Sequence, residues 1–128
     1  AVLARTAATP SSLWLYASPA EARGRQLAEL AARGVRSSRS VSSGKLPRAD
    51  HIVAMGRADL WLDTVNYNAH GTGTDVLWAP LPPVVLSGNK IASMSFSSMA
   101  CVAGACVAGV RSRREYEDFA VSLASARM

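Results

Sequence analysis

The stretch that decides the predicted fold is residues 91–110, IASMSFSSMACVAGACVAGV, which contains no charged residue. As a helix, a stretch of this length spans about 30 Å, the thickness of the hydrocarbon core of a bilayer. Basic residues flank it on both sides, with Lys90 before it and Arg111, Arg113 and Arg114 after it. The length and the basic flanks together predict a transmembrane helix.

Four serines make this stretch only mildly apolar, which leaves a second interpretation open. A helix of the same composition is also found buried inside soluble proteins. The sequence alone therefore does not separate a span from a buried helix. The serines are Ser93, Ser95, Ser97 and Ser98.

Small residues recur within the stretch at the spacing that lets two helix backbones approach closely. Two neighbouring ridges result, and we expect them to pack against helices of other subunits. The predicted helix-packing residues are Ala100, Gly104 and Ala108 on one ridge and Ala105 and Gly109 on the other.

Beyond the stretch, residues 111–128 are charged but keep a helical period. Tyr116, Phe119, Ala120 and Leu123 fall on one face of a helix. An amphipathic C-terminal helix that continues the span is therefore expected.

The N-terminal third is predicted to hold one short helix and a linker. The tetrapeptide Ser18-Pro19-Ala20-Glu21 has the pattern of a capping box, so a helix is expected over residues 19–33 with Gly34 as its end. Residues 35–48 are rich in Ser and basic residues and are expected to form a solvated linker. An arm that binds phosphates is the alternative.

Between the linker and the span, residues 47–67 carry apolar residues at nearly helical spacing and predict a second helix. Residues 66–75 contain two glycines and are expected to break it. The prolines of residues 78–83 predict an extended segment. It suits a polyproline II ligand for a partner and, equally well, an approach to a membrane surface with Trp78 at the interface. The segment Gly71-Thr72-Gly73-Thr74 lacks the lysine of a phosphate loop, so nucleotide binding is not expected.

The predicted fold class is thus mainly α, with short N-terminal helices, a Pro-rich extended segment, and one transmembrane helix that continues into an amphipathic helix. Three segments follow from it. Residues 1–48 form an N-terminal arm, residues 49–89 a helix with the Gly/Pro-rich segment, and residues 90–128 the span and tail. The predicted membrane-flanking residues are Trp78, Lys90, Arg111, Arg113 and Arg114.

Composition and the placement of reactive residues argue against an enzyme. The chain has 128 residues, a net charge of +5 and only two histidines, His51 and His70. Cys101 and Cys106 lie in the predicted span without an ionisable neighbour, so neither has a base to activate it. No catalytic, cofactor-binding or metal-ligating residue is predicted, and no cofactor is expected.

Residues 80–114 resemble the membrane-entry region of small single-span subunits of mitochondrial respiratory complexes, most nearly the subunit VIIc type of cytochrome c oxidase. The resemblance consists of Leu81-Pro82, then Asn89-Lys90, then a span with small residues and an exit that carries Arg111. It implies a non-catalytic accessory subunit of the respiratory chain. It also implies a place in the mitochondrial inner membrane, with the chloroplast thylakoid membrane as the alternative.

The expected partners are other subunits of a membrane complex and lipid, whereas nucleic acid is not expected. The three basic residues after the span place the C-terminus in the matrix. Two other functions stay open. The basic charge suits an RNA- or ribosome-associated binding protein, and the Ala-rich helix suits an assembly or virion protein.

Overall fold

The computed structural model describes residues 2–6, 10–105 and 110–126. The chain divides into two compact units, Ala1–Pro47 and Arg48–Met128. The three segments predicted from the sequence stay a prediction.

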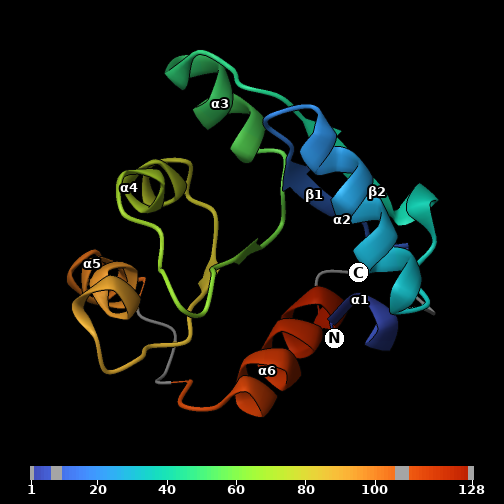
Figure 1. The fold of residues 1–128 in the computed structure, drawn as a ribbon. Helices are drawn as coiled ribbons and strands as arrows, with labels where there is room; N and C mark the ends of the chain where they lie inside the picture. Colours follow the sequence, from blue (N-terminus) through green and yellow to red (C-terminus); the bar gives the residue numbers. More distant parts are fainter. Residues whose placement is uncertain (1, 7–9, 106–109, 127–128) are drawn as a thin grey trace. The chain divides into compact units, whose positions relative to one another are not determined.

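The first unit is built around a pair of parallel strands joined by a helix (Figure 1). β1 pairs with β2 in a register that runs from Leu13 opposite Ser40 to Tyr16 opposite Ser43. Parallel strands need such a crossover connection, which α2 supplies here. The elements in order are α1 (Val2–Arg5), β1 (Leu13–Tyr16), α2 (Glu21–Ala32), the 3₁₀ helix η1 (Ser37–Arg39) and β2 (Ser40–Ser43).

The helix predicted over residues 19–33 is confirmed by α2, and Gly34 ends it as expected. Gly34 has φ +71°, and its N–H donates to the carbonyl of Ala31 at 2.9 Å. The N–H of Val35 donates to the carbonyl of Leu30 at 2.9 Å, which completes a Schellman motif. The capping box does not form, because the N-cap residue is Ala20 and no side chain caps the helix.

The prediction of a solvated linker over residues 35–48 is wrong, because this range contains η1 and β2. The guanidinium of Arg39 donates to the carbonyls of Leu3 at 2.7 Å, Ser11 at 2.9 Å and Thr6 at 3.1 Å. A side chain that satisfies three main-chain carbonyls holds the N-terminal segment against η1. Arg39 therefore has a structural role.

The second unit repeats the strand–helix–strand arrangement. β3 pairs in parallel with β4, Trp61 opposite Pro83 and Leu62 opposite Val84, and α4 connects them. A parallel bridge joins Leu86 to Val110, with α5 in the connection. The elements in order are α3 (Arg48–Met55), β3 (Trp61–Leu62), α4 (Gly71–Trp78), β4 (Pro83–Val84), the 3₁₀ helix η2 (Ile91–Ser93), α5 (Ser95–Val102) and α6 (Arg113–Ala126).

Helices α4 and α5 pack closely in the core of this unit. Phe96 and Val76 are completely buried. A Cβ atom added to Gly73 would lie 2.6 Å from Cδ2 of Phe96. Real Cβ atoms are not found so close to another carbon, so the contact between the helices requires a glycine at this position.

The predicted fold class, mainly α with a transmembrane helix, is wrong. Residues 91–110 do not form one helix: η2, α5 and the bridge residue Val110 divide them. α5 ends at Val102 with Ala103 as its C-cap, and Gly104, with φ +72°, closes the helix by donating its N–H to the carbonyl of Cys101. Within the described part of the chain, every helix is too short or too polar to cross a membrane.

The serines explain part of this difference. Ser93, Ser95, Ser97 and Ser98 each donate a side-chain hydrogen bond to a carbonyl three or four residues earlier. Such local bonds compete with a regular helix and favour helix starts and turns. The helix therefore begins only at Ser95.

Two further predictions about the middle of the chain need correction. The helix predicted over residues 47–67 ends at Met55, and β3 lies inside the same range. Residues 66–75, expected to break a helix, contain the first five residues of α4. Gly73 is tolerated there because it packs on Phe96.

Candidate functional site

The N-terminus of α4 is open. His70 is the N-cap residue, and no side chain caps the helix. Its carbonyl accepts the N–H groups of Gly73 at 2.9 Å and Thr74 at 3.3 Å. The N–H groups of Gly71 and Thr72 precede the first intrahelical bond, and the first turn of α4 contains no acidic residue. Such a helix end attracts anions, phosphates above all, through its N–H groups and its dipole.

The loop that leads from β3 to α4 is held at several points. The carboxylate of Asp63 accepts the N–H of Ala69 at 2.9 Å. The side-chain amide of Asn68 donates to the carbonyl of Thr64 at 2.9 Å, and the N–H of Asn68 donates to the carbonyl of Ala92 at 2.8 Å. Asn68 and Asp63 are both buried. These hydrogen bonds therefore fix the position of His70 and of the start of α4.

Burial raises the pKa of the Asp63 carboxyl above its ordinary value of 3.8. The N–H groups of Ala69 and Thr64 oppose this shift in pKa, as does the charge of His70. A buried carboxyl group loses solvation when it ionises, and these donors return part of it. Asp63 is thus a structural acid that His70 influences electrostatically.

The ring of His70 is exposed but held on two sides. Its centroid lies 4.7 Å from that of Tyr67, with the two rings inclined by 44°. Its Nε2 lies 2.9 Å from Oγ of Ser95, the first residue of α5. Side chains from the loop and from α5 therefore set the position of the His70 ring at the N-terminus of α4.

One acidic residue lies within α4, and a basic residue from α3 neutralises it. Nε and Nη2 of Arg48 both donate to Oδ1 of Asp75, at 2.9 and 2.7 Å. The hydrogen bond to Asp75 raises the pKa of Arg48. The positive charge of Arg48 reduces the repulsion between Asp75 and an anion at the start of α4. The same ion pair links α3 to α4.

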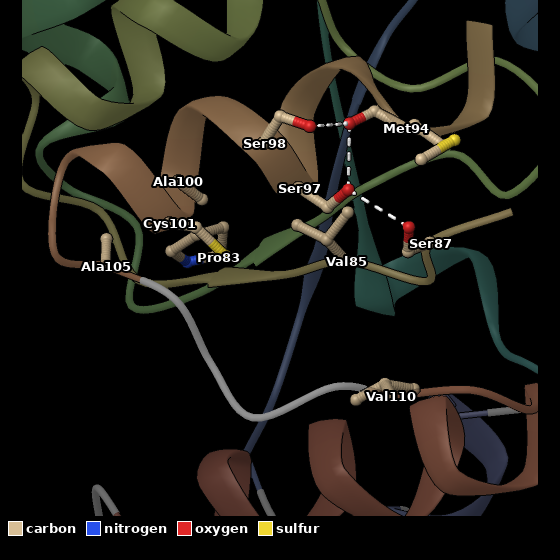
Figure 2. A pocket seen from close by; sticks show the side chains of 10 residues that line it. All are labelled: Pro83, Val85, Ser87, Met94, Ser97, Ser98, Ala100, Cys101, Ala105 and Val110. Carbon is tan, nitrogen blue, oxygen red and sulfur yellow. Dashed lines mark hydrogen bonds between the residues drawn. The ribbon is translucent and has the colours of Figure 1, made fainter. Parts of the chain in front are cut away.

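A hollow of about 330 Å³ lies elsewhere in this unit, between β4, α5 and Val110 (Figure 2). The side chains that line it are apolar or are serines, and none of those described is charged. Figure 2 shows the hydroxyl of Ser97 between that of Ser87 and the carbonyl of Met94. The described side chains that line the hollow carry no charge, so the candidate site is the start of α4.

The structure places the predicted helix-packing residues as follows. Ala100 is buried within α5, and Gly104 and Ala105 form the turn that closes it. Ala108 and Gly109 lie outside the described residues. Their packing against other subunits stays a prediction.

The predicted membrane-flanking residues are not brought together around one helix. Trp78 is the exposed last residue of α4, and Lys90 is the N-cap of η2. Arg111 follows the bridge residue Val110, and Arg113 and Arg114 begin α6. The sequence prediction and the candidate site share no residue.

The residues of the site were missed for two reasons. Residues 66–75 were interpreted as a helix breaker, and Gly71-Thr72-Gly73-Thr74 was rejected as a phosphate loop because it lacks a lysine. A pattern in the sequence does indicate them. An acidic residue follows the short apolar strand Trp61–Leu62, and a Gly/Thr-rich segment then precedes the apolar residues of α4. A strand, a loop and a helix that begins with small residues are typical of phosphate sites.

Comparison with known proteins shows what the chain is similar to. Residues 3–128 match glycosyl transferase family 41. A probable UDP-N-acetylglucosamine–peptide N-acetylglucosaminyltransferase of Arabidopsis thaliana is 40% identical over 116 residues, which are 89% of this chain and 12% of that protein. The UDP-N-acetylglucosamine–peptide N-acetylglucosaminyltransferase of Caenorhabditis elegans is 32% identical over 113 residues, 88% of this chain and 10% of that protein.

A solved structure shows the same fold. A mutant O-GlcNAc transferase of Thermobaculum terrenum superposes with a TM-score of 0.84 and 30% identity, over 92% of this chain and 24% of that one. The chain belongs to glycosyl transferase family 41. It spans about an eighth or less of the length of the two curated relatives.

This family overturns several expectations drawn from the sequence. The resemblance to a respiratory-complex subunit is wrong, and so is the prediction of a non-catalytic accessory protein, because the relatives are transferases. The alternatives of an RNA-associated or virion protein are wrong for the same reason. The expected place in an organellar inner membrane is contradicted as well. The predicted partners, other subunits and lipid, stay a prediction.

Proposed function

We propose that the chain is part of the catalytic region of an enzyme that transfers N-acetylglucosamine from UDP-N-acetylglucosamine to a hydroxyl group of a peptide. The match of residues 3–128 to glycosyl transferase family 41 supports this proposal. The names of the relatives supply the donor, the sugar and the acceptor class.

The role proposed for this chain is to bind the diphosphate of the donor at the start of α4. The open helix end carries the proposal: the N–H groups of Gly71 and Thr72 precede the first intrahelical bond, and no acidic side chain lies in the first turn. Gly71, Thr72 and Thr74 are all exposed, so a diphosphate has access to them.

This position suits the chemistry of the transfer. The acceptor oxygen forms a bond to the anomeric carbon of the sugar and loses its proton to a base, while the bond from that carbon to the β-phosphate oxygen breaks and UDP leaves. Negative charge builds up on the departing β-phosphate. The N–H groups and the dipole of α4 stabilise that charge, more strongly as it develops.

A charge placed at the start of α4 tests the proposal, with UDP as the probe in the intact protein. Thr72→Glu puts a carboxylate beside the N–H groups, where it favours the helix but repels a diphosphate. We expect its affinity for UDP to fall at least about tenfold, the equivalent of about 1.4 kcal/mol. Thr72→Gln, which has the same shape without the charge, should change the affinity much less.

Two results would contradict the proposal. The first is an unchanged affinity of Thr72→Glu for UDP, which would place the diphosphate elsewhere. The second is the absence of any UDP binding and of sugar transfer from UDP-N-acetylglucosamine to peptide in the wild-type protein. A thermal unfolding curve of each variant confirms that the helix is intact.

A further inference from the structure

We propose that the segment from β3 into the following loop contains a binding site for one buried water molecule, held by Nε1 of Trp61, Oδ2 of Asp63 and Oδ1 of Asn68. The inference goes beyond the proposed function and does not depend on it, because it concerns buried atoms of the loop and none of its tests uses a nucleotide. It assigns a ligand to side-chain atoms that the candidate site does not use.

The three atoms are buried, and none of them forms a hydrogen bond with any described residue. Asp63 is 4% exposed and Asn68 is 0% exposed, so bulk solvent does not reach their side chains. Burying a polar group is unfavourable unless it is hydrogen-bonded, and nearly all such groups in proteins have a partner in the protein or in ordered water. Three of them within eight residues of the chain therefore indicate a ligand.

The side chains of Trp61 and Asp63 lie on the same face of the chain. The N–H of Trp61 donates to the carbonyl of Pro82 at 2.9 Å, and the N–H of Asp63 donates to that of Val84 at 3.0 Å. The two residues thus have the same orientation along an extended segment, in which side chains two residues apart point to one side.

The indole of Trp61 also influences the carboxylate of Asp63. Burial raises the pKa of the Asp63 carboxyl, and the Trp61 side chain is among the groups that lower it. The indole N–H therefore lies near the carboxylate, yet no direct hydrogen bond joins these two described side chains. A polar pair that is close but not in direct contact is the arrangement that a water molecule bridges.

Hydrogen bonds of the loop bring Asn68 to the same place. Oδ1 of Asp63 accepts the N–H of Ala69, the residue after Asn68, at 2.9 Å. Nδ2 of Asn68 donates to the carbonyl of Thr64, the residue after Asp63, at 2.9 Å. The side chain of Asn68 is thus held along the backbone next to Asp63. One oxygen of each side chain, Oδ2 of Asp63 and Oδ1 of Asn68, is left for the water.

The chemistry of the three atoms selects water over a cation. They comprise one donor, the indole N–H, and two acceptors. A water molecule donates two hydrogens and accepts at least one, so a single water satisfies all three atoms, and about three hydrogen bonds are typical of a buried water. The indole N–H would instead repel a cation. In the described part of the chain, no group of three His, Cys, Asp or Glu side chains is placed to hold a metal ion.

The proposed water links the strand to the end of the loop. Trp61 belongs to β3, whereas Asn68 lies two residues before His70, the N-cap of α4. The water therefore acts together with the direct hydrogen bonds that hold the loop between the strand and the helix.

A crystal structure of the intact wild-type protein, at a resolution that shows ordered waters, tests the proposal. We expect one water within about 2.7 to 3.2 Å of all three atoms. Trp14 is the matched control, because its Nε1 donates directly to Oγ of Ser43 at 2.7 Å and should have no water. The absence of a water next to Trp61 would overturn the inference. A metal ion in its place, or a direct bond from a protonated Asp63 to Oδ1 of Asn68, would overturn it as well.

A double-mutant cycle gives a second reading in solution. Trp61→Phe removes the donor, Asn68→Ala removes one acceptor, and urea unfolding measures the stability of each variant and of the pair. Because either change loosens the same water, we expect the two together to destabilise less than the sum of their separate effects. Trp14→Phe combined with Asn68→Ala is the control pair and should be additive. Additive effects of Trp61→Phe and Asn68→Ala would show that no shared water couples the two residues. UDP binding is not measured here, so failure of this inference leaves the proposed function standing.

Discussion

The hydroxyl of Tyr116 on α6 donates a hydrogen bond of 2.9 Å to the main-chain carbonyl of Asp63, at the end of β3. Asp63 N–H in turn donates to the carbonyl of Val84 at 3.0 Å. The C-terminal helix is thereby tied to the strand that leads into the loop of the candidate site. Burial raises the pKa of Tyr116, which keeps its hydroxyl protonated as the donor.

Tyr116→Phe should destabilise the second unit. The substitution removes one part-buried hydrogen bond and leaves a main-chain carbonyl without that donor, at a cost of about 1 to 2 kcal/mol in the free energy of unfolding. Urea unfolding measures the change. Tyr67→Phe, at an exposed side chain, is the control and should change the stability little. Equal stability of Tyr116→Phe and the wild type would show that the bond contributes nothing.

Gly73→Ala should destabilise the contact between α4 and α5. In an open helix this substitution stabilises, because alanine is the better helix former. Here the added Cβ would lie 2.6 Å from Phe96, so the two helices must shift, at a cost of about 1 to 3 kcal/mol. Thermal unfolding of the variant checks the sign. Gly24→Ala in α2, where nothing lies within 4 Å of the added atom, is the matched control and should be neutral or stabilising.

Sequence patterns within a few residues of each other predicted two of the helices, α2 and α6. α2 ends at Gly34 because glycine adopts the left-handed conformation of the Schellman turn, and that signal is contained in the sequence around it. The apolar face that includes Phe119 and Ala120 likewise predicted a C-terminal helix, which the structure has as α6.

The prediction of a transmembrane helix over residues 91–110 was wrong because it considered only the length of the uncharged stretch and its flanks. It did not consider pairing with residues distant in the sequence. Val110 lies opposite Leu86 in an isolated parallel bridge, so the end of the supposed span pairs with a segment distant in the sequence. The helix that begins the candidate site was missed for a related reason. A glycine such as Gly73 weakens an isolated helix, but its contact with Phe96 repays that cost in the folded unit, and such a contact is not visible locally.

Asp63→Asn should change how stability depends on pH. Because burial raises the pKa of the Asp63 carboxyl, the folded protein retains a proton that the unfolded chain releases at pH values just above 3.8. Wild-type stability therefore falls as pH rises from that value through the raised pKa, and this contribution is constant above it. Asparagine does not titrate and lacks the effect.

The difference in unfolding free energy between Asp63→Asn and the wild type should thus shift in favour of the variant as pH rises through this window and then level off. Urea unfolding at a series of pH values measures it. Asp59→Asn, at an exposed aspartate, provides the comparison. A difference between Asp63→Asn and the wild type that does not vary with pH would mean that Asp63 titrates alike in the folded and unfolded chains.

Arg39 gives the sharpest test of the first unit, because one side chain serves three main-chain carbonyls, those of Leu3, Thr6 and Ser11. Arg39→Met keeps much of the side-chain volume but removes all of the donors. Hydrogen bonds from a charged group contribute about 1.5 to 3 kcal/mol each, and losing several together should cost at least about 2 kcal/mol. Arg39→Lys should recover only part of this, since one ammonium group cannot reproduce the planar fork of a guanidinium.

Hydrogen exchange at the amides of β1 and β2 reports on this unit alone, and we expect protection to fall in the order wild type, Arg39→Lys, Arg39→Met. Arg36→Met, at an exposed neighbouring arginine, is the matched control and should exchange like the wild type. Unchanged protection in Arg39→Met would show that the N-terminal segment is held by other contacts.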